Sequence, residues 1–377
     1  MKELFCVPQG KFSLQRLPLR HHEQLRAWDA ADEYLLTYLA DAQLPAPDSQ
    51  TLIINDSFGA LATALAAHKP YIITDSYLAE QATQLNLKAN NLAQHPVQFL
   101  NSLSTHEVAL DLVLIKAPKT LALLEDLLHR LRPYLRPSTQ IIVAGMLKHL
   151  PSSVWTILQR LVGPTQNALA QKKARLIFAT FDPALTPPPN PYPIIYTLEN
   201  TAFTLCNHAN VFSREQLDIG TRFFLQHLPS NFQGKHIVDL GCGNGVVGLL
   251  AASLNADASL HFVDESYMAV ASAQQNFSQA FGASKQASFR VGDTLQGFAA
   301  NSMDLILCNP PFHQQQTIGD HLAVNMFKQA YTTLRRNGEL WVIGNRHLGY
   351  PGLLKKRFGN SELIASNSKF VIIKAVR

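Results

Sequence analysis

The C-terminal half of the chain alternates apolar runs, turn residues and apolar-periodic stretches. A glycine-rich turn separates the first apolar run from the stretch that follows it, and this order then recurs. Strands separated by helices are typical of a mostly parallel, doubly wound sheet. The predicted strands are residues 236–240, 260–264, 303–308 and 339–344, and the predicted helices are residues 246–254, 267–277 and 323–334.

The N-terminal half repeats this order. Residues 71–86 (YIITDSYLAEQATQLN) resemble residues 261–276 (HFVDESYMAVASAQQN), and residues 111–120 (DLVLIKAPKT) align with residues 304–313 (DLILCNPPFH). Self-similarity of this kind indicates a repeated unit. The sequence therefore predicts a duplicated α/β domain.

A proline-rich segment, PALTPPPNPYP at residues 183–193, lies between the halves. No helix interior or central strand tolerates this proline density, so the segment is predicted to be a linker. We expect an N-terminal domain at residues 1–190 and a C-terminal domain at residues 191–377. An apolar fraction of 47% in 377 residues is sufficient for two packed cores.

The composition of the chain indicates where the protein is located better than it indicates which reaction it catalyses. No signal peptide opens the chain and no run of eighteen apolar residues occurs, so a soluble, cytoplasmic protein without a membrane partner is expected. The 4 cysteines form no CxxC or Cys/His cluster, which predicts neither a metal site nor a disulfide framework. A net charge of +5 permits an acidic partner such as nucleic acid without requiring one.

The glycine turn is the first candidate for a binding site. Gly241, Gly243 and Gly245 lie between a strand that ends near Asp239 and the following helix. Small residues here let a ligand approach backbone N–H groups at the positive end of a helix. Asp264 ends the next strand, where an acidic residue accepts hydrogen bonds from ribose hydroxyls. The pattern indicates a cofactor that contains adenosine.

Two other interpretations of the turn stay open at this point. Residues 243–248 also satisfy GxGxxG, which would suit a nicotinamide dehydrogenase. In the other interpretation the glycines serve only a sharp turn and Asp264 is a helix cap. A third acidic residue, Asp293, follows the next predicted strand. Acidic residues at successive strand ends face one crevice of a doubly wound sheet, which favours a binding site.

The strand at residues 303–308 ends abruptly in Asn309, Pro310, Pro311 and Phe312. Prolines stop the ladder and hold the chain in one conformation. A planar amine can then donate one proton to the Asn309 side-chain oxygen and the other to the Pro310 carbonyl, which aims its lone pair at a methyl sulfonium. Phe312 would stack on the ring of a flipped base. A dehydrogenase has no use for this segment.

Together these motifs resemble class I S-adenosylmethionine-dependent methyltransferases, which implies two tandem Rossmann-like domains. The resemblance implies that the glycine turn packs against the methionine moiety, that Asp264 holds the ribose and that Asp293 contacts the adenine amino group. Residues 210–228 resemble a segment that covers the cofactor pocket in enzymes modifying bacterial ribosomal RNA. Phe212 and Asp218 are therefore further cofactor-binding candidates.

The Asn-Pro-Pro-aromatic motif marks methylation of an exocyclic or amide nitrogen in this family. Phe312 followed by His313, and a degenerate first copy, resemble the guanine-N2 ribosomal RNA subgroup. NPPFHQQ, residues 344–350 and residues 366–377 are most similar to members that act on a specific guanine of 23S ribosomal RNA. The alternatives are a 16S ribosomal RNA guanine-N2 enzyme, a protein glutamine or DNA adenine methyltransferase, and a non-catalytic RNA-binding scaffold.

The first copy has lost the features of the site. It keeps Gly59 alone in its turn, and Lys116 stands where the second copy has Asn309. We therefore expect the N-terminal domain to bind RNA and no cofactor, and the sequence indicates no obligate protein partner. The candidate RNA contacts are Lys116, Lys172, Lys173 and Arg175 in the first half, and His313 and Arg346 in the second.

Overall fold

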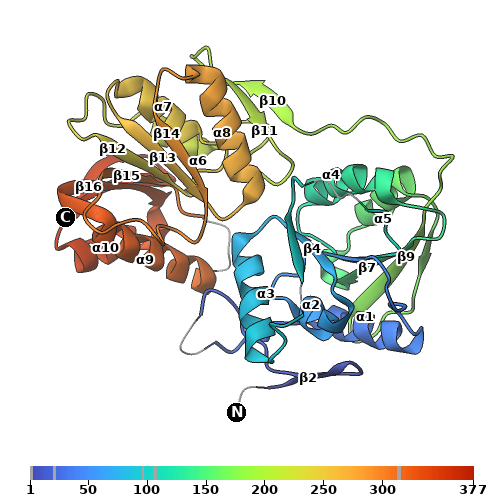
Figure 1. Ribbon diagram of the computed structural model, residues 1–377. Helices are drawn as coiled ribbons and strands as arrows, with labels where there is room; N and C mark the ends of the chain where they lie inside the picture. The colour runs from blue at the N-terminus through green and yellow to red at the C-terminus, as the bar shows by residue number, and fades with distance from the viewer. Residues whose placement is uncertain (1–2, 20–22, 96, 105–107, 312–315) are drawn as a thin grey trace. The chain divides into compact units, whose positions relative to one another are not determined.

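A computed structural model describes residues 3–19, 23–95, 97–104, 108–311 and 316–377 of the chain. The chain divides into two compact units, Met1–Pro191 and Tyr192–Arg377, called here the N-terminal and C-terminal units (Figure 1). Among the described helices, none has the length and apolar character needed to cross a membrane.

The N-terminal unit is built on a seven-stranded sheet in the order β5-β4-β3-β6-β7-β9-β8. The pairs among β3 to β7 are parallel, and β9 is antiparallel to both of its neighbours. Its strands are β1 (Phe5–Val7), β2 (Gly10–Phe12), β3 (Thr51–Ile54), β4 (Tyr71–Thr74), β5 (Gln98–Asn101), β6 (Leu112–Lys116), β7 (Gln140–Met146), β8 (Thr165–Asn167) and β9 (Ala174–Thr180). Its helices are α1 (Ala30–Asp41), α2 (Ala60–Ala64), α3 (Tyr77–Ala89), α4 (Leu121–Leu131) and α5 (Ser153–Leu161), with 3₁₀ turns η1 (Ala66–His68), η2 (Arg132–Tyr134) and η3 (Leu147–His149).

The C-terminal unit repeats this topology, in the order β14-β13-β12-β15-β16-β18-β17. Its strands are β10 (Ile194–Thr197), β11 (Thr204–Asn207), β12 (His236–Leu240), β13 (Ser259–Asp264), β14 (Ala287–Val291), β15 (Met303–Cys308), β16 (Leu334–Asn345), β17 (Glu362–Ser366) and β18 (Phe370–Val376). Its helices are α6 (Ile219–Leu225), α7 (Val246–Leu254), α8 (Tyr267–Phe281), α9 (Gln316–Thr333) and α10 (Tyr350–Phe358), with the 3₁₀ turn η4 (Arg346–Leu348). The prediction of two doubly wound, mostly parallel sheets is confirmed.

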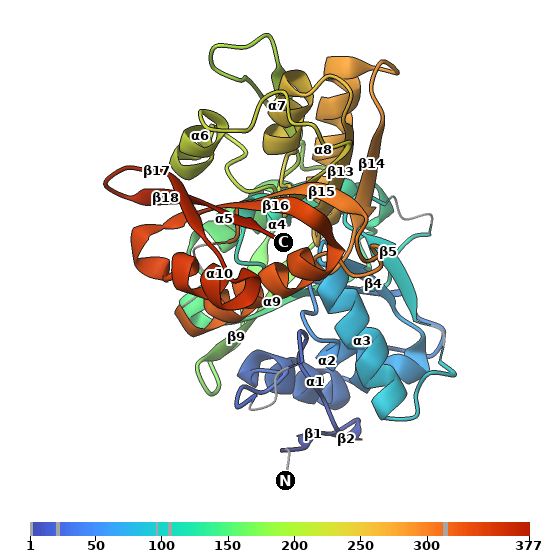
Figure 2. The same ribbon diagram turned by 90° about the vertical axis from the view of Figure 1, so that its left-hand side faces the viewer.

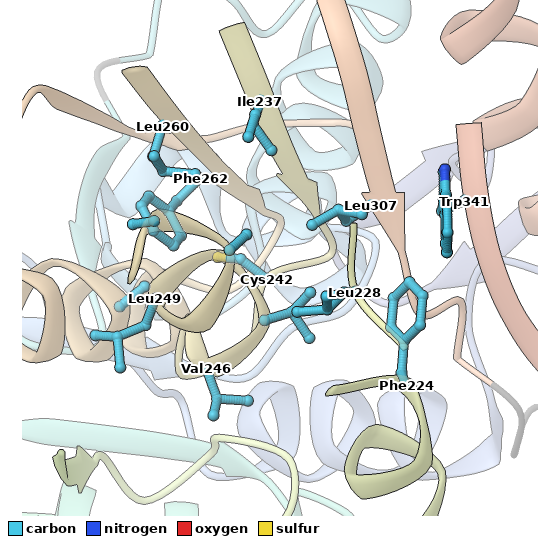
Figure 3. Close-up of a cluster of buried hydrophobic side chains, with 14 of the residues drawn as sticks. Phe224, Leu228, Ile237, Cys242, Val246, Leu249, Leu260, Phe262, Leu307 and Trp341 are labelled. Carbon is cyan, nitrogen blue, oxygen red and sulfur yellow. The ribbon is translucent and has the colours of Figure 1, made fainter. Parts of the chain in front are cut away.

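Helices cover both faces of the C-terminal sheet (Figure 2). Successive side chains of a strand point to opposite faces, so Ile237 packs in the cluster with α6, α7 and α8, whereas Val238 packs in the cluster with α9 and α10. Burial on both faces explains why β15 is almost entirely apolar. Figure 3 shows the first cluster, including Phe224, Leu228, Ile237, Cys242, Val246, Leu249, Leu260, Phe262, Leu307 and Trp341.

The correspondence between the units extends to single buried hydrogen bonds. In the C-terminal unit, the Asn276 side chain donates to the backbone carbonyl of Asn244 at 2.9 Å, in the turn before α7. In the N-terminal unit, the Asn86 side chain donates to the carbonyl of Phe58 at 2.8 Å, in the turn before α2. Each asparagine ties the turn after the first parallel strand to the second crossover helix, so the duplication is preserved in its interior polar contacts.

Candidate active site

The glycine turn between β12 and α7 is close-packed on one side and open on the other. Gly245 is the N-cap of α7 with φ of 79°, and a Cβ there would lie 2.8 Å from the Ala273 side chain of α8. A Cβ on Gly248 would lie 2.3 Å from the Phe262 ring. A Cβ on Gly243, in contrast, would meet no described heavy atom within 4 Å. The turn therefore presents backbone to open space at Gly243.

Asp264, at the end of β13, holds this turn in place. Its Oδ2 accepts a hydrogen bond from the Gly243 amide at 2.9 Å, and its Oδ1 accepts one from the Ser266 amide at 3.0 Å. The structure thus brings Asp264 and the glycine turn together.

Two more carboxyl groups follow the neighbouring strands. Asp239, on β12, accepts a hydrogen bond from the Gly248 amide at 2.8 Å. Burial, together with the charge of Asp264, raises the pKa of Asp239 to about 8. Asp293 lies two residues beyond β14, where burial raises its pKa. Because β12, β13 and β14 are adjacent in the sheet, the acidic series predicted from the sequence lies along one sheet edge.

The proline segment begins beside the glycine turn. Cys308, the last residue of β15, pairs with Leu240 of β12, so Asn309 and Gly241 leave the same edge of the sheet on neighbouring strands. The Asn309 side-chain nitrogen donates to Thr221 Oγ1 at 3.0 Å. Its Oδ1 is buried and accepts no hydrogen bond from any described residue. Pro310 is buried, and Phe312 and His313 lie outside the described residues.

The start of α6 contacts the proline segment. Asp218 caps α6, and its Oδ2 accepts hydrogen bonds from the Thr221 amide at 2.8 Å and from the Thr221 hydroxyl at 3.3 Å. Thr221 in turn contacts Asn309. The Phe212 side chain is 54% exposed. The sequence did not predict Thr221 as a site residue. Its one signal there is its position three residues after Asp218, which caps the helix.

The structure does not agree with the prediction that Lys116 contacts RNA. Its ammonium group lies 2.8 Å from Asp29 Oδ1 and 2.7 Å from Asp32 Oδ1, and its side chain is 14% exposed. Burial by itself would lower the pKa of Lys116, but the two aspartates outweigh it and raise the pKa. A buried ammonium group neutralised by two carboxylates does not fit the expected contact with an RNA phosphate.

The other candidate RNA contacts lie nearer the surface. Lys172 and Lys173 are exposed at the tip of a hairpin, and Arg175 is half-buried in β9. Arg346 is exposed in η4, where its guanidinium group donates to the Asn367 carbonyl at 3.0 Å. Among the residues that the structure describes, no group of three or more His, Cys, Asp or Glu side chains could hold a metal ion.

Comparisons with known proteins identify relatives of both units. The RLMG N-terminal domain model matches residues 2–183, and the methyltransferase small domain model matches residues 202–374. A solved structure of the 16S rRNA N2 methyltransferase RsmC of T. thermophilus, in complex with AdoMet and guanosine, has the same fold. It aligns with a TM-score of 0.77 at 19% identity and covers 100% of this chain and 97% of that chain.

Relatives named ribosomal RNA large subunit methyltransferase G match over the full length. The Streptomyces avermitilis protein is 48% identical over 382 residues, which cover 100% of both chains. The Pseudomonas paraeruginosa protein is 50% identical over 374 residues, which cover 99% of each chain. The chain therefore belongs to the ribosomal RNA large subunit methyltransferase G family.

Proposed function

We propose that this protein acts in the cytoplasm and transfers a methyl group from S-adenosylmethionine to the exocyclic N2 of one guanine in 23S ribosomal RNA. The observation that carries the proposal is the Asn309 amide, whose buried oxygen has no described donor and which leaves the sheet beside the glycine turn. The names of the full-length relatives support ribosomal RNA of the large subunit as the substrate.

The residues present fit the methyl donor. Gly243 leaves open space beside the backbone, and Asp264, which accepts a hydrogen bond from the Gly243 amide, places a carboxylate next to this space for ribose hydroxyls. Bound S-adenosylmethionine would supply an electrophilic methyl group on a sulfonium. Asp293 would then accept a hydrogen bond from the adenine amino group. A metal ion has no part in this proposal.

The chain's own residues would orient the acceptor. Asn309 Oδ1 and the Pro310 carbonyl each accept one hydrogen bond from the guanine amine, which localises the nitrogen lone pair and aligns it with the methyl group. The N–C bond forms as the C–S bond breaks, S-adenosylhomocysteine leaves, and the nitrogen releases one proton to water. Phe312 is proposed to stack on the guanine ring.

The function is tested by incubating the protein with methyl-labelled S-adenosylmethionine and ribosomal RNA from cells that lack it, followed by mapping of the labelled nucleotide. Label on guanine N2 of 23S RNA is the expected result. Label on 16S RNA would move the substrate to the small subunit. Label on protein or on DNA would overturn the RNA assignment, and absence of transfer would favour a non-catalytic scaffold.

We expect Asp264→Ala to weaken S-adenosylmethionine binding, because a charged acceptor for ribose hydroxyls is lost. Hydrogen bonds to a charged group contribute roughly 1.5–3 kcal/mol, or about 10- to 150-fold in affinity. Isothermal calorimetry measures the effect. Thr74→Ala is the matched control, because Thr74 Oγ1 accepts from the Ser76 amide at 3.1 Å in the N-terminal unit, just as Asp264 accepts from Ser266. Wild-type affinity in the Asp264 variant would reduce this residue to a helix cap.

We further propose that the N-terminal unit supplies RNA affinity through its β8–β9 hairpin. Gln171 and Ala174 pair across a two-residue loop in which Lys172 and Lys173 have φ of 46° and 63°. Such loops favour Asn-Gly, because both positions need a left-handed backbone. Two lysines at strained, exposed positions are costly for folding, which supports a role for their charges in binding phosphates.

Replacing this pair by the favoured residues, Lys172→Asn with Lys173→Gly, is expected to weaken RNA binding while the protein becomes slightly more stable. Loss of two phosphate contacts should reduce the slope of log affinity against log salt by about 1 to 2. Filter binding over a salt series measures the slope. Lys69→Asn is the control, since Lys69 is an exposed lysine of the same unit with φ of 52°. An unchanged slope in the double variant would remove the hairpin from the RNA interface.

A further inference from the structure

Catalysis by Asn309 depends on which end of its amide faces the acceptor. The oxygen can accept a hydrogen bond from the guanine amine, whereas the NH₂ group is itself a donor and cannot. The two ends have nearly the same shape, so packing alone distinguishes them weakly. A neighbouring group of fixed hydrogen-bonding polarity can make the choice, and Thr221 is placed to do so.

Asp218 determines which atom donates and which accepts in the hydrogen bond between Thr221 and Asn309. An ionised carboxylate only accepts hydrogen bonds, so the single proton of the Thr221 hydroxyl points to Asp218 Oδ2, 3.3 Å away. The lone pairs of Thr221 Oγ1 then face Asn309. Only the NH₂ end of the amide can satisfy them, at 3.0 Å, and Oδ1 is directed away from Thr221.

We propose that Thr221 is a positioning residue that, together with Asp218, orients the Asn309 amide for methyl transfer. The inference rests on the proposed function of Asn309. It differs from the pocket-covering role expected for Asp218, because the contact partner is the acceptor site. Thr221 acts through Asn309 and touches neither the methyl donor nor the base.

The local structure holds this arrangement. Thr221 is 6% exposed, and its own amide donates to Asp218 Oδ2 at 2.8 Å, so the carboxylate is fixed by two hydrogen bonds from one residue. Gly220 makes room for it. A Cβ at Gly220 would lie 3.0 Å from Asp218 Oδ2 and 3.0 Å from the Phe370 ring. A larger residue there would displace the carboxylate that sets the polarity.

The N-terminal unit provides an internal comparison. Asp29 caps α1 as Asp218 caps α6, and Asp32 follows three residues later, at the position of Thr221. Lys116 follows Ile115, which pairs with Ile54, as Asn309 follows Cys308, which pairs with Leu240. The contact between these positions is present in both units, but in the N-terminal unit it is a lysine–aspartate ion pair with no amide to orient. The N-terminal unit, which has no asparagine at the position of Asn309, therefore also has no hydroxyl at the position of Thr221.

Thr221→Val tests the inference, because valine keeps the shape and removes the hydroxyl. Turnover on 23S ribosomal RNA is expected to fall about tenfold or more, while the dissociation constant for S-adenosylmethionine stays within about twofold of wild type. Thr221→Ser restores the hydroxyl and is expected to recover most of the turnover. Full turnover in the valine variant, or equal loss in the serine variant, would overturn the proposed role.

A double-mutant cycle separates positioning from general support of the fold. If Thr221 acts through Asn309, adding Thr221→Val to Asn309→Ala lowers turnover no further. Losses that multiply would show that Thr221 acts independently of the amide and would contradict the inference. Wild-type protein is measured in the same assay. If wild type transfers no methyl group, the proposed function is overturned. If wild type and the valine variant are equally active, only the role of Thr221 is overturned.

Discussion

Asn309→Ala is expected to lower the rate of methyl transfer on the order of a hundredfold or more, with S-adenosylmethionine affinity near that of wild type. Loss of one preorganised hydrogen-bond partner in an active site has effects of this size. The amide oxygen is buried and accepts nothing from the described residues, which suits an acceptor kept for an incoming amine. Single-turnover kinetics with bound RNA isolate the chemical step from product release.

Two further measurements test whether the Asn309 variant is impaired in the chemical step alone. The variant's thermal unfolding midpoint should stay near that of wild type, because Asn309 is half-buried and its described hydrogen bond is the one to Thr221. Calorimetry with S-adenosylmethionine should give an unchanged dissociation constant. A wild-type single-turnover rate would refute the proposed role of the amide. A large loss of cofactor affinity would instead make Asn309 part of the donor pocket.

Local patterns were sufficient to predict the fold. Alternating apolar strands and helices, with glycine at the first turn, predicted the doubly wound sheets, because strand period and turn chemistry are properties of neighbouring residues. The placement of Asp239 and Asp264 followed for the same reason. Strands that are parallel and adjacent end at one edge, so a residue at a strand end is located once the strand order is known.

Long-range polar contacts could not be predicted in this way. The bond between Asn309 and Thr221 spans 88 residues, and that between Lys116 and Asp29 spans 87. No periodicity links such positions. The sequence indicated that Lys116 had replaced Asn309, but it could not indicate that two aspartates from the start of α1 form ion pairs with this lysine.

The buried ion cluster around Lys116 is expected to contribute strongly to the stability of the N-terminal unit. Burial, with the neighbouring charges of Asp29 and Asp56, raises the pKa of Asp32 to about 6, although Lys116 opposes this shift. Without the lysine, the pKa of Asp32 should rise further. A carboxyl whose pKa is higher in the folded state stabilises the fold while it is protonated, and this contribution is lost as the pH rises through the folded pKa.

Lys116→Ala should therefore lower the free energy of unfolding by about 3 kcal/mol at pH 8, because two carboxylates are left without their cation. The difference from wild type should shrink as the pH falls from 8 towards 6, because Asp32, whose pKa is higher in the variant than in wild type, is protonated first in the variant. Urea denaturation at several pH values measures both effects. Lys172→Ala is the matched control: Lys172 also pairs with a carboxylate of α1, Glu33 at 3.0 Å, but its side chain is 78% exposed. An exposed pair contributes about 0–1 kcal/mol. If the two variants were equally stable, or if the Lys116 difference did not change with pH, the lysine would not be the charge that Asp29 and Asp32 require.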